Sequence, residues 1–229
     1  MSRKYSTECI VLKSSIRRDY DKVCVFFSPH YGKFSAWVRG VRRVNSRKQG
    51  SLDTLNRIQA VFSELPNGVK TLAEVSVIDP YSSLKTTMPG ISKALYIIEL
   101  VHRFFYDEAH DYESASEAYL LLTKSLASLN KFYSKYPEGV YTFVPVRIMN
   151  MFEVRLMKTL GYEMSLNSYL LNKLAITSEE MDYLNSLKLG SAKSALRTLR
   201  KVYSSADTVI KKYIADIAAE KIYSKTLFW

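Results

Sequence analysis

The residues best suited to chemistry are the cations of one short segment, GVRRVNSRKQGSL at residues 40–52. It carries Arg42, Arg43, Arg47 and Lys48 between two glycines and holds no acidic residue. Lys and Arg side chains displace the counterions that surround a nucleic-acid backbone, so such a segment is typical of a phosphate-binding protein. Because it lacks a hydrophobic repeat, we expect a loop that neighbouring elements must hold in place.

The charge of the whole chain is concentrated near this segment. The formal net charge is +11, from 33 Lys+Arg and 22 Asp+Glu. Residues 1–50 hold 12 basic and three acidic side chains, so most of the surplus lies there. Charge that serves only solubility is the alternative, but such charge is normally mixed in sign. We therefore favour a polyanionic partner.

Alternating apolar and polar residues predict five strands within residues 6–80. TECIVLKSS, DKVCVFFS and KFSAWVRG come first, and RIQAVFSEL and VKTLAEVSVID flank a Pro-Asn-Gly turn. Five short strands with a long loop between the third and fourth predict an OB-fold barrel, with an SH3-like barrel as the alternative. Cys9 and Cys24 fall inside these strands, and we expect both to be reduced and buried.

The hydrophobic period changes to the helical value after residue 90. Leu95, Ile98, Val101 and Phe105 lie at helical intervals. Residues 114–133 and 144–162 follow the same pattern, and further helices are predicted from Ser178 and within 191–205 and 206–225. Gly161 is expected to end the third helix.

The predicted fold class is therefore α+β. A five-stranded OB-fold barrel at residues 1–80 is followed by a linker at 81–90 and an all-helical bundle at 91–229. The start of the chain has only a short apolar run broken by Lys13, too short for a secretory segment or a membrane span. We expect a cytoplasmic protein, associated with the nucleoid if the partner is DNA.

The motifs of residues 5–162 resemble those of the RecO family of bacterial recombination mediators. Gly32 and Lys33 match a Gly-Lys pair of the family, and residues 40–52 follow its pattern G-x-R-R-x-x-S-R-x-x-G-x-L. ALYIIELVHRF and FEVRLMKTLGY are similar to two of its helical motifs. Many members continue after LGY with four cysteines that bind zinc, whereas this chain has no cysteine there and cannot build that site.

The resemblance implies an OB-fold followed by helices and a function without covalent chemistry. It implies binding of single- and double-stranded DNA, annealing of complementary strands, and help for a recombinase in displacing single-strand-binding protein. The implied partners are DNA, RecR and the acidic C-terminal tail of single-strand-binding protein, and no cofactor is expected. A plain single-stranded nucleic-acid-binding module without mediator activity is the alternative function.

The predicted DNA-binding residues lie in the third strand and in the loop that follows it. Strand alternation puts Phe34 inside the barrel and Trp37 with Arg39 outside, where an aromatic ring can stack on bases. Tyr20 and Tyr31 are further candidates for stacking. The DNA-binding set is Lys33, Trp37, Arg39, Arg42, Arg43, Arg47 and Lys48.

A second basic group lies near the C-terminus, with its members at i, i+4, i+7 and i+8 on one predicted helical face. Three interpretations stay open: a solvated surface, a site for an acidic peptide, and an extension of the DNA path. The group consists of Lys193, Arg197, Arg200 and Lys201.

Enzymatic chemistry is not predicted. No Gly-Lys-Ser/Thr follows a glycine at the spacing of a nucleotide-binding loop. Acidic pairs such as Asp107 with Glu108, and Glu179 with Glu180, are typical of helix ends and loops. Four residues could be imagined as metal ligands, but two of them fit an ordinary helix face, so we expect no metal site. They are Glu99, His102, Asp107 and His110.

Overall fold

The structure is a computed structural model, and it describes residues 3–17, 20–43, 46, 48, 50–107, 111–137, 143–162, 176–189 and 200–218. The side chains at positions 188, 189, 200, 201 and 204 are not part of that description. Contacts divide the chain into two compact units, Met1–Lys85 with Ile98–Leu120 and Thr86–Ile97 with Leu121–Trp229. The predicted domain boundaries stay a prediction. Two helices, residues 88–104 and 112–135, each contribute residues to both units.

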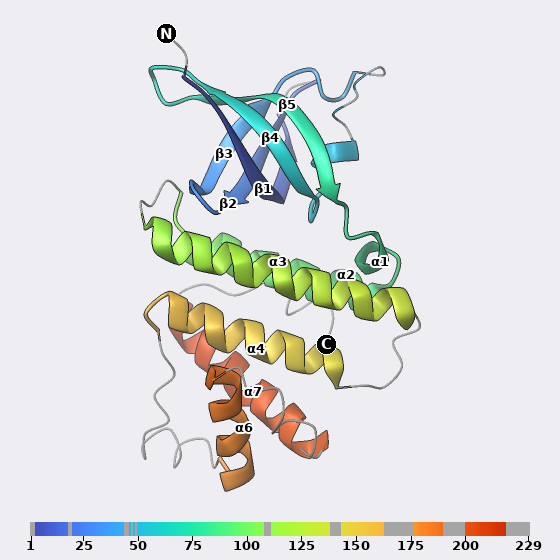
Figure 1. Cartoon of the computed structure of the whole chain (residues 1–229), viewed down its shortest axis with the longest axis vertical. Helices are drawn as coiled ribbons and strands as arrows, with labels where there is room; N and C mark the ends of the chain where they lie inside the picture. Colours follow the sequence, from blue (N-terminus) through green and yellow to red (C-terminus); the bar gives the residue numbers. More distant parts are fainter. Residues whose placement is uncertain are drawn as a thin grey trace. The chain divides into compact units, whose positions relative to one another are not determined.

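Five strands form a closed barrel, which confirms the predicted OB-like architecture (Figure 1). They are β1 (Arg3–Ile16), β2 (Lys22–Ser28), β3 (Gly32–Val38), β4 (Arg57–Glu64) and β5 (Lys70–Asp79). Their order around the barrel is β1-β2-β3-β5-β4. The contact between β3 and β5 is parallel and the other pairs are antiparallel. The long β3–β4 connection contains a short 3-10 helix, η1 (Gly50–Leu52).

Aromatic rings fill the barrel. Phe26, Phe34 and Phe62 are fully buried, and their ring centroids lie between 5.0 and 5.7 Å apart. Burial of one such side chain stabilises a fold by about 1.5–3 kcal/mol. Cys9 and Cys24 are buried free thiols, as predicted, and burial raises the pKa of both.

The Pro-Asn-Gly turn joins β4 to β5 as the sequence predicts. Gly68 has φ +79°, in the left-handed region that favours glycine, and its N–H donates to the carbonyl of Leu65 at 2.9 Å. The N–H of Val69 donates to the side-chain oxygen of Asn67 at 3.2 Å. The turn therefore fixes the register of the hairpin.

Six helices are described after the barrel strands. They are α1 (Ser82–Lys85), α2 (Met88–Phe104), α3 (Tyr112–Lys135), α4 (Val144–Thr159), α6 (Ser178–Leu189) and α7 (Arg200–Ile217). Gly161, with φ +80°, ends α4 as predicted: its N–H donates to the carbonyl of Lys158, and that of Tyr162 donates to the carbonyl of Met157. α7 is continuous across residues 205 and 206, where two separate helical segments were predicted.

The start of α6 depends on a residue that the prediction did not name. Thr177 caps the helix, because its hydroxyl accepts the N–H of Glu180 at 3.3 Å. The carboxylate of Glu180 in turn accepts the N–H of Thr177 at 2.8 Å. This reciprocal pair is a capping box, whose sequence pattern is T-x-x-E.

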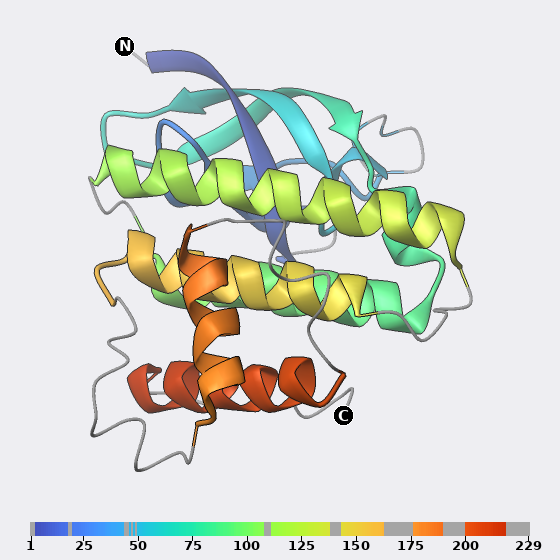
Figure 2. The same cartoon turned by 60° about the horizontal axis from the view of Figure 1, so that its bottom comes forward.

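Within the second unit, α4, α6 and α7 contact one another, and α6 crosses α7 in Figure 2. Phe152 and Leu156 of α4 and Ile210 of α7 are completely buried. Glu153 of α4 is also completely buried, and its Oε1 accepts a hydrogen bond from the hydroxyl of Tyr96 at 2.7 Å. None of the described helices is both long enough and apolar enough to span a bilayer.

Candidate nucleic-acid interface

Two connections meet at one end of the barrel and hold each other in place. One is the β1–β2 turn with Tyr20 and Asp21, and the other is the start of the β3–β4 loop. The N–H of Gly40 donates to Oδ1 of Asp21 at 2.8 Å, and the N–H of Arg42 donates to the carbonyl of Tyr20 at 3.1 Å. Gly40 has φ +64°, which lets the chain turn at that point. The beginning of the basic loop is therefore fixed by its own backbone N–H groups, which donate to the Asp21 carboxylate and to the Tyr20 carbonyl.

This anchored end presents several cations to solvent. Arg39, Arg42 and Arg43 are exposed, and so is Arg17 from the β1–β2 turn. No acidic residue occurs in the sequence of residues 39–52. We call the four arginines, together with Tyr20 and Asp21, the basic end. Like charges so close together repel one another, and a bound polyanion would relieve that repulsion.

Of the aromatic residues in or beside the basic strands, the structure brings only some to the surface. Phe34 lies inside the barrel, as predicted, and Tyr31 packs on Tyr5 with ring centroids 4.4 Å apart. Trp37 is half-buried on the outer side of β3, where the alternation predicted it. Tyr20 is 56% exposed. Cζ of Arg43 lies 5.8 Å from the centroid of the Tyr20 ring.

Two lysines of the predicted set have partners within the chain. Nζ of Lys33 donates to the carbonyl of His102 at 2.8 Å and lies 3.1 Å from Oδ1 of Asp107. Nζ of Lys48 donates to the carbonyl of Ala73 at 2.6 Å, which holds the basic loop against β5. Their DNA-binding roles stay predictions, and the stronger case lies with the exposed arginines.

Part of the predicted set lies outside the described residues. Arg47 belongs there, and so do Lys193 and Arg197 of the C-terminal basic group. Arg200 and Lys201 form the first turn of α7, without described side chains. The predicted roles of these residues stay predictions.

The outer barrel surface around Lys33 differs from the basic end because residues within 98–107 and 111–120 cover it. Ile10 of β1 lies opposite Phe27 of β2 and Arg57 of β4, and Phe27 lies opposite Lys33. The ring of Phe27 packs on Phe105, with centroids 4.8 Å apart. We call this surface, defined by Glu8, Ile10, Phe27, Lys33 and Arg57, the covered face.

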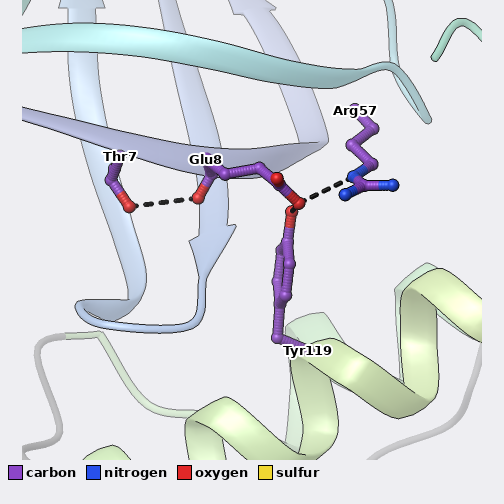
Figure 3. A network of polar contacts seen from close by, with 4 residues as sticks. All are labelled: Thr7, Glu8, Arg57 and Tyr119. Atoms are coloured by element: carbon purple, nitrogen blue, oxygen red, sulfur yellow. Dashed lines mark hydrogen bonds and ion pairs between the residues drawn. The ribbon is translucent and has the colours of Figure 1, made fainter. Parts of the chain in front are cut away.

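Glu8 is the centre of a polar network on the covered face (Figure 3). Its Oε1 accepts hydrogen bonds from Nε of Arg57 at 2.7 Å and from the hydroxyl of Tyr119 at 2.6 Å. The hydroxyl of Thr7 donates to the backbone carbonyl of Glu8 at 3.1 Å. Partial burial alone would raise the pKa of Glu8, but the bonds from Arg57 and Tyr119 lower it below its usual value. The charges here serve to join β1, β4 and α3.

The residues considered as metal ligands have other contacts. Glu99 pairs with Arg103 at 3.2 Å, and Asp107 pairs with Lys33. Burial lowers the pKa of His102, and the nearby charge of Lys33 adds to that effect. His110 lies outside the described residues. In the part of the chain that the structure describes, no three His, Cys, Asp or Glu residues gather as metal ligands.

Sequence comparison agrees with the barrel and its motifs. The family model described as "Recombination protein O N terminal" matches residues 1–81, which contain all five strands. Several relatives match well beyond that segment, and each is named DNA repair protein RecO. The chain is thus similar to RecO proteins, in the barrel and beyond it.

The RecO relatives are distant. The protein of Desulforudis audaxviator is 25% identical over 72% of this chain and 60% of its own length. The protein of Acetivibrio thermocellus is 25% identical over 80% of this chain and 67% of its own, and that of Salinibacter ruber is 27% identical over 54% and 46%. This chain therefore matches only about half of the length of several RecO relatives.

Proposed function

We propose that this chain is a member of the RecO family and acts in DNA repair and recombination by binding DNA through the basic end. The observation that carries the proposal is the set of exposed arginines on two connections that are bonded to each other. The names of the relatives, DNA repair protein RecO, support the same role. The proposed reaction is strand annealing, in which no covalent bond is made or broken.

The proposed mechanism is electrostatic. A guanidinium can bind a phosphate through two parallel hydrogen bonds, and such contacts position a strand without reading its sequence. Arg39, Arg42 and Arg43 follow one another closely, so they can neutralise neighbouring phosphates of one strand or approach two strands. Less repulsion between the backbones would let base pairing select the partner strand. Binding should therefore weaken as salt is raised.

Partner proteins form the second part of the proposal. Displacement of single-strand-binding protein, contact with its acidic tail, contact with RecR and help in loading a recombinase are proposed from family membership. They require cations or apolar surface beyond the barrel. We assign no residue of the helical unit to these contacts.

The test is annealing of two complementary labelled oligonucleotides that are coated with the matching single-strand-binding protein. The triple variant Arg39→Ala/Arg42→Ala/Arg43→Ala should anneal at least about tenfold more slowly, because several phosphate contacts are lost at once. Its affinity for bare single strands should also depend less on salt, with a slope smaller by about two. Circular dichroism should show an unchanged fold.

A matched control removes the same charge elsewhere. Lys124, Lys131 and Lys158 are exposed helical lysines of the second unit, and their triple alanine variant should anneal like the wild type. Wild-type annealing in the arginine variant would move the DNA site away from the basic end. A wild type that binds bare strands but never anneals coated ones would leave only the plain binding module.

A further inference from the structure

The β1–β2 hairpin end exposes two large side chains, one aromatic and one aliphatic. Tyr20 is 56% exposed and Ile16 is 60% exposed. By contrast, Phe26, Phe27 and Phe62 are completely buried. An aromatic ring at the surface beside several arginines is suited to a ligand that has both a flat apolar face and a negative charge.

The backbone beneath this ring is held on both sides. The carbonyl of Tyr20 accepts the N–H of Arg42, and the carbonyl of Asp21 accepts the N–H of Arg17 at 2.9 Å. The carboxylate of Asp21 is bonded to Gly40. Because these bonds use backbone atoms of Tyr20 and no atom of its ring, the ring is presented from a fixed point. A pre-organised ring loses less entropy when a ligand stacks on it.

A cation accompanies the ring. The guanidinium of Arg43 lies over the ring, 5.8 Å from its centroid, and Arg42 follows from the same loop. A ligand that stacks on the ring would therefore place its charged group within reach of an arginine. A nucleotide has this combination, since its base is flat and its phosphate is anionic.

We propose that Tyr20 is the platform on which one unpaired base of a bound strand stacks, while Arg43 holds a neighbouring phosphate. This inference rests on the proposed function and specifies its ligand as a nucleobase in single-stranded form. A paired base within a duplex is covered on both faces by its neighbours, so it cannot occupy the platform without being unstacked. Tyr20 thus favours single strands, whereas the arginines bind both forms.

The experiment compares two oligonucleotides of equal length and charge, one of thymidines and one of abasic tetrahydrofuran units. Wild type should bind the thymidine strand about tenfold more tightly, which is the order expected for a base stacked on an aromatic ring. Tyr20→Ala should lose most of this preference for the thymidine strand, while the salt dependence of its DNA affinity should stay that of the wild type. Tyr20→Phe should retain the ratio because it keeps the ring.

Tyr112→Ala is the matched control, since Tyr112 is also 56% exposed and lies at the start of α3. It should discriminate between the two strands like the wild type. The inference is overturned if Tyr20→Ala keeps the full ratio, or if the wild type binds both strands equally. Failure of the proposed function looks different, because the wild type would then bind neither strand even at low salt.

Discussion

The covered face and the basic end lie on the same small barrel, yet they use charge in opposite ways. On the covered face, Glu8 is bonded to Arg57 and Tyr119, and Lys33 is bonded to a carbonyl and to Asp107. At the basic end, Arg39, Arg42 and Arg43 are exposed in a stretch without acidic residues. Charges that are matched within the chain stabilise the fold, whereas surplus charge of one sign is suited to binding.

Strand β3 passes from one surface to the other. Lys33 is the second residue of β3 and lies opposite Phe27. Arg39 follows directly after the last residue of the strand. Six residues of strand span about 20 Å. Lys33 at one end of the strand is therefore bonded within the chain, whereas Arg39 at the other end is exposed to solvent, where it can meet a ligand. Membership of one basic segment does not decide which role a residue has.

The largest expected effect is on the covered face. Phe27→Ala should lower the free energy of unfolding by about 3–5 kcal/mol, because it empties a fully buried site that packs on Phe105 and Tyr119. Urea denaturation measures the loss. At the basic end, Tyr20→Ala removes an aromatic ring of similar size and should change stability by less than about 0.5 kcal/mol. Equal losses at the two sites would refute the contrast.

A smaller loss is expected from Arg57→Leu. Glu8 would keep its bond to Tyr119 but lose its cation in a half-buried site, which should cost about 2 kcal/mol at pH 7. The folded-state pKa of Glu8 is lowered, so this stabilisation is present above the usual carboxyl pKa and is lost as pH falls through the folded value. Thermal melts at pH 7 and near pH 3 should show the difference between wild type and variant shrinking on acidification.

Arg39→Leu provides the control for that experiment, since it removes an exposed arginine from the other surface. Its stability should stay close to that of the wild type at both pH values. Its affinity for single strands should fall, whereas folded Arg57→Leu should bind them normally. An unfolding energy of Arg57→Leu that does not depend on pH would mean that the ion pair with Glu8 contributes little.

The smallest effect concerns the backbone of the basic loop. Gly40→Ala forces a side chain into φ +64° and should cost about 1 kcal/mol, although the new Cβ would meet Arg43 only at an ordinary contact distance of 3.6 Å. Gly50→Ala is the comparison, because Gly50 has no positive φ and open space around its Cβ position. Chemical denaturation of both variants should show a lower free energy of unfolding for Gly40→Ala only. Equal stabilities would show that the loop relaxes freely at residue 40.

Much of the fold could be predicted because local periodicity reports secondary structure directly. The two-residue alternation of GKFSAWV placed Phe34 inside and Trp37 outside, and the Pro-Asn-Gly turn marked the β4–β5 hairpin. Gly161 marked the end of α4 in the same way. The residue that caps α6 was missed, although Thr177 and Glu180 form a pattern that the sequence contains.

The candidate site was predictable only in outline. The basic segment was found from composition, but Lys33 and Lys48 could not be separated from the exposed arginines by charge alone. Their partners, the carbonyls of His102 and Ala73, lie far away in the sequence. Arg17 was counted among the basic residues of the N-terminal part, yet nothing local connected it with the loop at residues 39–43.

The sequence by itself determined the strands, most of the helices, the turns and the surplus of positive charge, because each depends on residues that are close neighbours in the chain. Only the tertiary structure decided that residues within 98–107 and 111–120 cover one face of the barrel and that Tyr20 and Asp21 anchor the basic loop. Those contacts join residues that are distant in sequence, and no period or composition encodes such pairs. For this reason composition was enough to predict a polyanionic ligand, whereas only the structure separated the exposed arginines from Lys33 and Lys48, which have partners within the chain.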